Sequence, residues 1–532
     1  MAQKRYNPIT TVKIGKRGST IRRGKSPQKT ALHIKTESHG HGFLKICIVA
    51  LLVLIQLIVL VSLFLWLSGV FWGYLAFSFV ASVLAALHVL STEKSGHNKS
   101  VWILFLLCFF FCGYVFYIFS YVEPFYGKSR EKYEAIKERT KQYDRDEVPA
   151  LDDPRLRQDA LFFRTVGPFP VWEHTQGEYF PSGTKLFDDL LERIEGAEKF
   201  IFLEFFIVAD GSLLHNLSAV LMEKAKAGVD VRFIYDDMGP KGQFSRRTKK
   251  MLKEAGVKLY PFNRLLPLFS LSINYRDHRK IVVIDGKIAY TGGVNLADEY
   301  INAKRMYGYW KDAGIRIEGD GVDEFTLLFL RQWEYLTDAK EDYAPYLSLA
   351  EKKEGSPLIV YGDGLDYRAN IGRSAYINLF AKAEEKLYLM VPYFLPDETI
   401  ENLLIEKAHA GVDVRLLIPE IPDKPFVYAQ TRNYAERLLS HGIRVFVMKD
   451  SFVHAKVMLT DYAAIVGSVN IDSRSFYEES ECAVYTADAK ILSEISEDFT
   501  ACFGDSVEIK ERKQSLGERI VTGFLRILSP LM

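Results

Sequence analysis

Cysteine is scarce in this chain, with five residues among 532. Three of the five lie inside long apolar runs, and the other two are Cys482 and Cys502. Their spacing matches no zinc site and implies no disulfide framework. Excess charge is also missing, since 68 Lys and Arg balance 67 Asp and Glu to a net charge of +1. The chain therefore lacks the overall basic field that is typical of nucleic-acid-binding proteins.

Basic residues are instead concentrated at the start of the chain. Residues 1–45 hold eleven Lys and Arg against one acidic residue, Glu37, and show little hydrophobic periodicity. This composition predicts a disordered basic tail. Such a tail is typical of a cytoplasmic segment beside a membrane span, and its charge also suits contact with anionic lipids.

Three long apolar runs follow the tail, at about 46–67, 72–90 and 101–122. Because about 20 apolar residues suffice to cross a bilayer, they predict a transmembrane region over 46–122 and a multi-pass protein of the cell membrane. The short break at 68–73 suits a tight helical hairpin. The first two runs together are too long for a cleaved signal peptide.

The side of the membrane on which the rest of the chain lies stays open. The basic tail favours a cytoplasmic N-terminus, and three full spans would then place the remainder outside. Seven Lys and Arg between residues 128 and 145 follow the third run, however, and favour the inside. Either the third run does not cross fully or the charge rule fails for this chain.

Beyond a charged, proline-containing linker predicted at 123–160, the chain repeats itself. Residues 225–234 and 408–417 are similar, and each reads as a helix end, a glycine stop and a strand. The similarity predicts two halves, at 161–345 and 346–532. Alternating helices and strands predict the α/β class with mostly parallel central strands.

The pattern His-x-Lys-x4-Asp occurs once in each half. It consists of His278, Lys280 and Asp285 in the first half, and of His454, Lys456 and Asp461 in the second. The residues between Lys and Asp are mostly β-branched or apolar, which favours a buried strand. On a strand the His and Lys share one face, whereas the Asp points to the other. We therefore expect chemistry from the histidines and lysines, and a structural role for the two aspartates.

Other polar residues follow each copy of the pattern. A glycine turn leads to Asn295 in the first half, and to Ser468 and Asn470 in the second. Further on, Asp312 and Glu481 each precede a stretch that alternates like a strand. A catalytic histidine needs a partner on its second ring nitrogen. We expect each acid to meet the histidine of its own half on a neighbouring strand.

The paired patterns resemble those of the phospholipase D superfamily. The stretches 392–397, 418–424 and 470–476 further resemble its bacterial cardiolipin synthase branch, and the resemblance covers essentially everything after the basic tail. It implies two α/β sandwich repeats related by a pseudo-twofold axis, with one active site between them and transmembrane helices in front. It also implies that Asp312 and Glu481 support the histidines.

The reaction that the resemblance implies is transphosphatidylation between two phosphatidylglycerol molecules, which gives cardiolipin and glycerol. One neutral His attacks phosphorus to form a phosphohistidine, and the other serves as acid and then as base. The lysines, Asn295, Ser468 and Asn470 hold the phosphate oxygens. No metal, other cofactor or nucleic acid is expected, the bilayer is the expected partner, and the oligomeric state stays open.

Several alternatives share these residues. They are a phospholipase D that hydrolyses lipids, a transphosphatidylase with another donor or acceptor lipid, and a phosphodiesterase acting on nucleic acid, which the apolar runs and the neutral charge disfavour. Among the histidines, the acidic cluster Glu478, Glu479 and Glu481 predicts a raised pKa for His454. That predicts His454 as the general acid and His278 as the nucleophile.

Two further apolar stretches lie outside the motifs. Residues 265–271 precede His278 in a predicted loop, which either dips into the membrane or folds onto the core. Residues 519–531 have apolar side chains at helical spacing and predict a C-terminal helix packed on the second half.

Overall fold

The computed structural model describes most of residues 54–511, together with Gly517. The undescribed positions in that range are 56, 60, 63–64, 66–67, 92–95, 110–112, 122–123, 146–150, 240–241, 264–274, 365–366 and 368. The chain divides into two units, 1–55 and 56–532, and only Leu54 and Ile55, both helical, are described in the first. The basic tail, most of the first apolar run, the loop at 265–271 and the C-terminal helix lie outside the described residues, so those expectations stay predictions.

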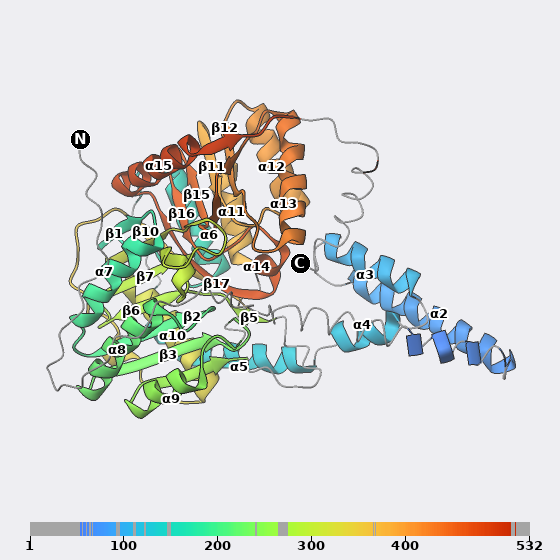
Figure 1. Cartoon of the computed structure of the whole chain (residues 1–532), viewed down its shortest axis with the longest axis horizontal. Coiled ribbons are helices and arrows are strands. Elements are labelled where there is room, and N and C mark those ends of the chain that lie inside the picture. The colour runs from blue at the N-terminus through green and yellow to red at the C-terminus, as the bar shows by residue number, and fades with distance from the viewer. Residues whose placement is uncertain are drawn as a thin grey trace, which may run out of the picture. The chain divides into compact units, whose positions relative to one another are not determined.

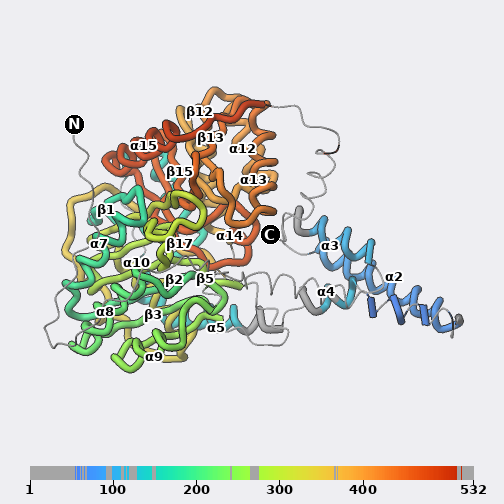
Figure 2. Tube along the Cα trace, viewed as in Figure 1, coloured from blue at the N-terminus to red at the C-terminus, as the bar shows by residue number. Residues whose placement is uncertain are grey.

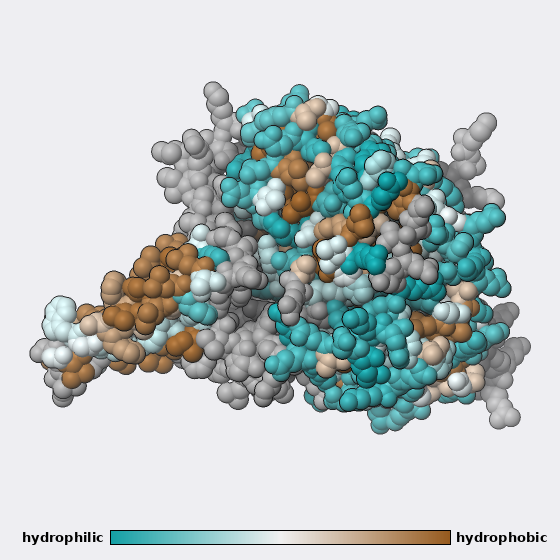
Figure 3. Space-filling view, turned by 180° about the vertical axis from the view of Figure 1, so that it is seen from behind, coloured by the Kyte–Doolittle hydropathy of each residue, from teal (hydrophilic) through white to brown (hydrophobic). Residues whose placement is uncertain are grey.

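Three apolar helices precede the sheets: α2 (Ser68–Ser91), α3 (Gly96–Cys108) and α4 (Gly113–Tyr121). They contact one another around a small cluster that includes Val89, Leu106 and Tyr117. Among the described residues, one helix, Gly69–Ser91, is long and apolar enough to cross a membrane, and 11% of its apolar window is buried. Apolar surface gathers over these helices (Figure 3).

These helices differ from the predicted runs at two places. The break expected at 68–73 is helical at the start of α2, because it contains no proline and its glycines are tolerated there. The third run is divided between α3 and α4, neither of which is long enough to span a bilayer alone.

The segment predicted as a linker is largely helical. It contains α5 (Pro124–Thr140) and the start of α6 (Pro154–Val166). The α5 helix contacts α10 (Val322–Thr337), where the rings of Tyr133 and Tyr335 stack with centroids 3.9 Å apart. A charged side chain of α5 also joins the two helices, because Arg139 forms an ion pair with Glu334 of α10.

The first half forms a seven-stranded sheet in the order β1-β9-β7-β6-β2-β3-β4. The strands are β1 (Thr175–Phe180), β2 (Phe200–Phe205), β3 (Asp230–Asp236), β4 (Lys258–Phe262), β6 (Ile281–Ile284), β7 (Ile288–Gly292) and β9 (Gly314–Gly319). The helices of this half, besides α10, are α7 (Gly183–Glu195), α8 (Ser212–Lys226) and α9 (Arg246–Glu254).

The second half repeats this order as β10-β17-β16-β15-β11-β12-β13, with β18 added at the edge. The strands are β10 (Leu358–Asp363), β11 (Lys386–Met390), β12 (Asp413–Pro419), β13 (Arg444–Met448), β15 (Val457–Thr460), β16 (Ala464–Gly467), β17 (Glu479–Thr486) and β18 (Ser506–Glu508). The helices are α11 (Ile371–Ala381), α12 (Glu398–His409), α13 (Pro425–Leu438), α14 (Ser473–Tyr477) and α15 (Ala489–Gly504). The two halves can be followed as green and orange regions in Figures 1 and 2.

The repeat read from the sequence is present in the structure. The α8 and α12 helices end just before Gly228 and Gly411, whose φ angles of 97° and 93° suit glycine, and β3 and β12 follow them. The expectation of mostly parallel central strands is wrong, because within the two strand orders given above only β2–β3–β4 and β11–β12–β13 pair in parallel. The other sheet neighbours are antiparallel, and β6–β7 and β15–β16 are joined by short hairpins.

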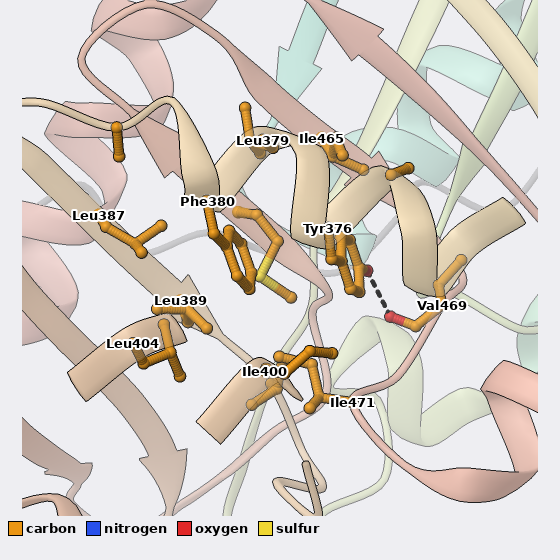
Figure 4. Packing of buried hydrophobic residues seen from close by; sticks show 14 of the residues in the cluster. Tyr376, Leu379, Phe380, Leu387, Leu389, Ile400, Leu404, Ile465, Val469 and Ile471 are labelled. Atoms are coloured by element: carbon orange, nitrogen blue, oxygen red, sulfur yellow. Dashed lines mark hydrogen bonds between the residues drawn. The ribbon is translucent and has the colours of Figure 1, made fainter. Parts of the chain in front are cut away.

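Three apolar cores stabilise this arrangement. One lies in each half, and the third is shared, joining residues such as Val283 of β6 with Val457 of β15. In the core of the second half, helix α11 packs its side chains against β11 and α12, and the Tyr376 hydroxyl donates to the Val469 carbonyl at 2.7 Å (Figure 4). The shared core holds the two sheets together, which is the condition for a site made by both halves.

Candidate active site

Each motif histidine follows a short strand that pairs with the opposite half. Strand β5 (Arg276–Asp277) pairs with the start of β17, and the His278 amide donates to the Ser480 carbonyl at 2.8 Å. Strand β14 (Ser451–Val453) pairs with β8 (Tyr309–Lys311), and the His454 amide donates to the Lys311 carbonyl at 2.7 Å. Each half thus holds the histidine of the other through backbone hydrogen bonds.

The motif lysines lie beside the histidines, although both pairs precede strands β6 and β15 rather than lying in them. Lys280 and Lys456 are buried, and each ammonium group donates to the carbonyl of the histidine two residues earlier. The Lys456 Nζ also lies 3.1 Å and 3.2 Å from the two ring nitrogens of His454. Burial lowers the pKa of Lys280, and it lowers that of Lys456 to about 7. Two cations are therefore held out of water at one place.

The acidic partners are exchanged between the halves. His278 Nδ1 lies 2.9 Å from Glu481 Oε1, and His454 Nδ1 lies 2.7 Å from Asp312 Oδ2. The expectation that each acid meets the histidine of its own half is wrong. The reason is the strand pairing, because Asp312 follows β8, which pairs with the strand before His454, and Glu481 belongs to β17, which pairs with the strand before His278.

The two buried acids differ in their electrostatic surroundings. Burial raises the pKa of Glu481 well above its usual range, the nearby Glu479 reinforces this, and Lys280 opposes it. Burial acts on Asp312 in the same direction, but the charge and hydrogen bond of His454 outweigh it, so the pKa of Asp312 is lowered. Asp312 is the acid that the structure keeps ionised.

Both histidines have a lowered pKa in this environment. Burial and the positive charges of Lys280 and Lys456 lower the pKa of His278 well below its usual range. Burial and Lys456 lower the pKa of His454 to about 4, although Asp312 acts in the opposite direction. A bound phosphodiester would add negative charge beside these groups and raise both values.

Aromatic rings surround His454 more densely than His278. The centroids of Tyr300, Trp310 and Phe452 lie 5.3 Å, 5.2 Å and 5.8 Å from that of His454. Phe206 lies 5.1 Å from His278 in an edge-to-face contact. The walls beside His454 are therefore apolar, while His278 faces acidic side chains.

The predicted phosphate-binding residues already have partners within the protein. Asn295 Oδ1 accepts from the Ile207 amide at 3.0 Å, and its Nδ2 donates to the Tyr300 hydroxyl at 2.9 Å. The Ser468 hydroxyl donates to Glu481 and accepts from the Cys482 amide at 3.0 Å. Phosphate binding by Asn295 and Ser468 stays a prediction, and the contact of Ser468 also orients Glu481.

Asn470 differs from its counterpart. Its Nδ2 donates to the Ser475 hydroxyl at 3.2 Å, whereas its buried Oδ1 has no hydrogen-bond partner within the part of the chain that the structure describes. A buried carbonyl oxygen without a donor is costly. A protonated ligand group at the site would satisfy it, so Asn470 also stays a predicted binding residue.

The motif aspartates lie at the far ends of their strands. Asp285 accepts from the backbone amides of residues 198–200 at 2.7–2.9 Å. Asp461 accepts from the amides of Glu384 and Glu385 at 2.8 Å and 3.1 Å, and from Arg155 at 2.9 Å. In both halves the carboxylate holds the start of the neighbouring strand, β2 or β11, which agrees with the structural role predicted for it.

A second acid and an arginine lie near His278, whereas the sequence predicts Glu479 near His454 and assigns no role to Arg474. Glu479 Oε2 lies 3.9 Å from His278 Nδ1, and Arg474 pairs with Glu479 at 2.9 Å. One ligand atom from each of His278, Glu479 and Glu481 falls within 4.8 Å of the others, a spacing that a metal ion could use. Arg474 neutralises Glu479, however, and the buried Lys280 lies beside both acids. This positive charge disfavours a cation.

Comparison with known proteins places these residues in a family context. A family model described as a cardiolipin synthase, phospholipase D-like domain matches residues 190–307 and 376–503, one range around each motif. A cardiolipin synthase of Geobacillus thermodenitrificans is 32% identical over 497 residues, covering 90% of this chain and 98% of that protein. An uncharacterised protein of Streptococcus mutans is 34% identical over 462 residues, covering 84% and 99%.

Among solved structures, a phosphatidylserine synthase of Haemophilus influenzae superposes with a TM-score of 0.54. The match covers 71% of this chain and all of that one, at 14% sequence identity. At that identity the likeness concerns the fold. It agrees with two α/β halves of the same strand order that meet at one pair of motifs.

Proposed function

The chain belongs to the cardiolipin synthase family, and from that premise we propose that it transfers a phosphatidyl group from one phosphatidylglycerol to another, giving cardiolipin and glycerol. The observation that carries the proposal is the pair of buried histidines, each held by a carboxylate of the opposite half and accompanied by a buried lysine. Such a site binds one phosphodiester and offers a nucleophile, an acid and two fixed positive charges.

In the first step, neutral His278 attacks phosphorus of the donor lipid through Nε2, because Glu481 occupies its Nδ1. The bond from phosphorus to the headgroup glycerol oxygen breaks. His454, protonated in the presence of the phosphodiester and held by ionised Asp312, gives its Nε2 proton to that oxygen. Glycerol leaves, and the phosphatidyl group stays on His278.

In the second step, His454 is neutral and takes the proton from the terminal hydroxyl of a second phosphatidylglycerol. The freed oxygen attacks phosphorus, and the nitrogen–phosphorus bond to His278 breaks with its electron pair returning to the ring. Cardiolipin leaves, and His454 is again protonated, so the cycle closes without another reactant. Lys280 and Lys456 offset the negative charge on the phosphate oxygens in both transition states.

Membrane anchoring suits this chemistry because both substrates reside in a bilayer. The exposed apolar helix within α2 supports a membrane anchor. We extend this to a multi-pass arrangement in which a helix from the run at 46–67 precedes α2, and α3 with α4 forms a third, broken segment. In this proposal the domains follow one another along the chain as a basic tail, a membrane region, connecting helices and two catalytic halves.

The assignment can be tested with the full-length protein in vesicles of phosphatidylglycerol labelled in its headgroup. Cardiolipin and free labelled glycerol should form in equal amounts, and a chelator should leave the rate unchanged. The double variant His278→Ala with His454→Ala is the matched control for contaminating enzymes. Formation of phosphatidate without cardiolipin would identify a hydrolase instead and overturn the proposal.

A further inference from the structure

The loop between β12 and α13 lies close to His454. The amides of Glu420 and Ile421 both donate to the Ser451 carbonyl, at 3.2 Å and 3.0 Å. Ser451 begins β14, three residues before His454. The position of this loop is therefore fixed by the same short strand that positions the catalytic side chain.

A loop of the first half meets it there. The Tyr309 amide donates to the Asp450 carbonyl at 2.8 Å. A Cβ on Gly308, whose φ is +72°, would lie 2.0 Å from that carbonyl oxygen and 2.9 Å from Ile421. Residues 306–307 and 423–426 together form what we call the acceptor rim.

Lys424 is the cation of the acceptor rim. Its ammonium group lies 4.7 Å above the ring of Tyr393, whose hydroxyl donates to Asp423. The Tyr393 ring is 6.5 Å from Phe452, which in turn contacts His454. Lys424 is exposed, and no carboxylate of the described residues lies within ion-pair distance of it. The acid next to it in the sequence, Asp423, instead accepts from the Tyr393 hydroxyl.

The charge of Lys424 also acts on the catalytic centre. The charge of Lys424 contributes to the lowered pKa of His278, and it opposes the burial that raises the pKa of Asp472 to about 6. Lys424 is also the N-cap residue of the fourteen-residue helix α13, whose amino end adds partial positive charge. The rim is thus the electropositive edge of a site whose inner cations are Lys280 and Lys456.

The same rim exposes large apolar side chains. Phe426 and Met306, one from each half, are both 48% exposed. Exposed apolar side chains on the same rim as a cation without an ion pair among the described residues match an amphiphile with a negative headgroup. A soluble alcohol or water would use neither feature.

We infer that Lys424 binds the phosphate of the acceptor phosphatidylglycerol while Phe426 and Met306 contact its apolar part. This rests on the proposed function, in which the acceptor carries its own phosphodiester one glycerol length from the attacking hydroxyl. The donor phosphate occupies the inner lysines, so the second phosphate needs a cation outside them. The rim supplies it, and thereby favours an anionic lipid over water as the acceptor.

Acceptor competition provides the test, because both acceptors draw on the same phosphohistidine. The full-length enzyme in phosphatidylglycerol vesicles would receive dissolved labelled glycerol as an uncharged acceptor. The measured quantity is the ratio of cardiolipin formed to labelled glycerol incorporated. Loss of an exposed ion pair predicts about a fivefold fall in that ratio for Lys424→Met. Lys424→Arg should restore most of it, and Phe426→Ser should lower it as well.

Lys352, an exposed lysine before β10 without an ion pair among the described residues, supplies the control Lys352→Met, which should keep the wild-type ratio. If free inorganic phosphate also binds at the acceptor rim, adding it to the wild type should lower the ratio of cardiolipin to incorporated glycerol. A wild type that makes cardiolipin, with an unchanged ratio in Lys424→Met, would overturn this inference alone. A wild type that makes no cardiolipin would overturn the proposed function itself.

Discussion

The two histidines occupy equivalent places in the two halves but have unequal surroundings. His454 is held by an acid whose pKa is lowered and is enclosed by three aromatic rings. His278 is held by an acid whose pKa is raised, with Glu479 and Arg474 nearby. An ionised partner stabilises an imidazolium, so the asymmetry favours His454 as the proton donor and His278 as the nucleophile.

The largest effect is expected from removing either histidine. Both His278→Ala and His454→Ala should abolish cardiolipin synthesis, because each histidine has a separate and necessary role. A donor lipid with an acidic leaving group should separate the roles, since such a group leaves without a proton. With it, His454→Ala should still form a phosphoenzyme, whereas His278→Ala should form none.

Acid-quench trapping and mass spectrometry of the labelled peptide would check this. Label on residue 278 is expected in the wild type. Label on residue 454 alone would show that His454 is the nucleophile and His278 the proton donor.

The next largest effect is expected at the acids. Asp312 Oδ2 accepts from His454 and from Trp310 at 3.3 Å, and its Oδ1 accepts from the Ala313 amide at 2.9 Å, so each of its oxygens faces a donor. In Asp312→Asn the side-chain NH2 group must point at one of these donors, so turnover should fall about 10²–10⁴-fold. Turnover of Glu481→Gln should fall only about tenfold, because the Ser468 hydroxyl can turn and accept from the new amide.

Turnover of folded protein, checked by near-ultraviolet circular dichroism, measures the two losses. Equal losses in the two variants would show that the acids are electrostatically alike after all.

The crossed pairing explains what could and could not be predicted from the sequence. Strand alternation predicts that His278 and Lys280 lie together and that Asp285 lies apart from them. The contacts of Lys280 and Asp285 agree with this, although β6 covers only Ile281–Ile284 and contains none of the three residues. The partners of the histidines depend on β5 and β8, which are two and three residues long. Strands so short have no periodicity, so pairing between the halves leaves no signal in one sequence.

The acidic cluster shows the consequence of that limit. Glu479 and Glu481 lie beside His278 rather than beside His454. The argument that they raise the pKa of His454 is therefore wrong. The same assignment of roles now rests on Asp312, whose ionised state could be read only after the acids were placed in space.

A smaller effect is expected in the pH profile. Because burial lowers the pKa of Lys456 to about 7, its ammonium form persists below that pH and is lost as the pH rises through it. The ratio kcat/KM reports the free enzyme, so it should fall above about pH 7. Lys456→Arg keeps its charge at all these pH values and should move the alkaline fall to higher pH. Lys280→Arg is the matched variant, and an unmoved profile in Lys456→Arg would exclude Lys456 as the titrating group.

The smallest effect on chemistry is expected at the motif aspartates, where the two halves should behave alike. Asp285→Asn replaces a carboxylate that accepts three backbone amide hydrogen bonds at the start of β2. It should lower the free energy of unfolding by about 1–3 kcal/mol, while turnover per folded molecule stays near that of the wild type. Asp461→Asn should act similarly at β11, with the added loss of its contact to Arg155.

Backbone hydrogen bonds and Arg155 lower the pKa of Asp461 against the effect of burial. The stabilisation by Asp461 is therefore present above the pKa of an unfolded aspartate and is lost as the pH falls through the folded value. Urea unfolding at neutral and acidic pH should show the difference between wild type and Asp461→Asn shrinking in acid. A folded Asp285→Asn protein as inactive as the histidine variants would show instead that the far end of the strand takes part in catalysis.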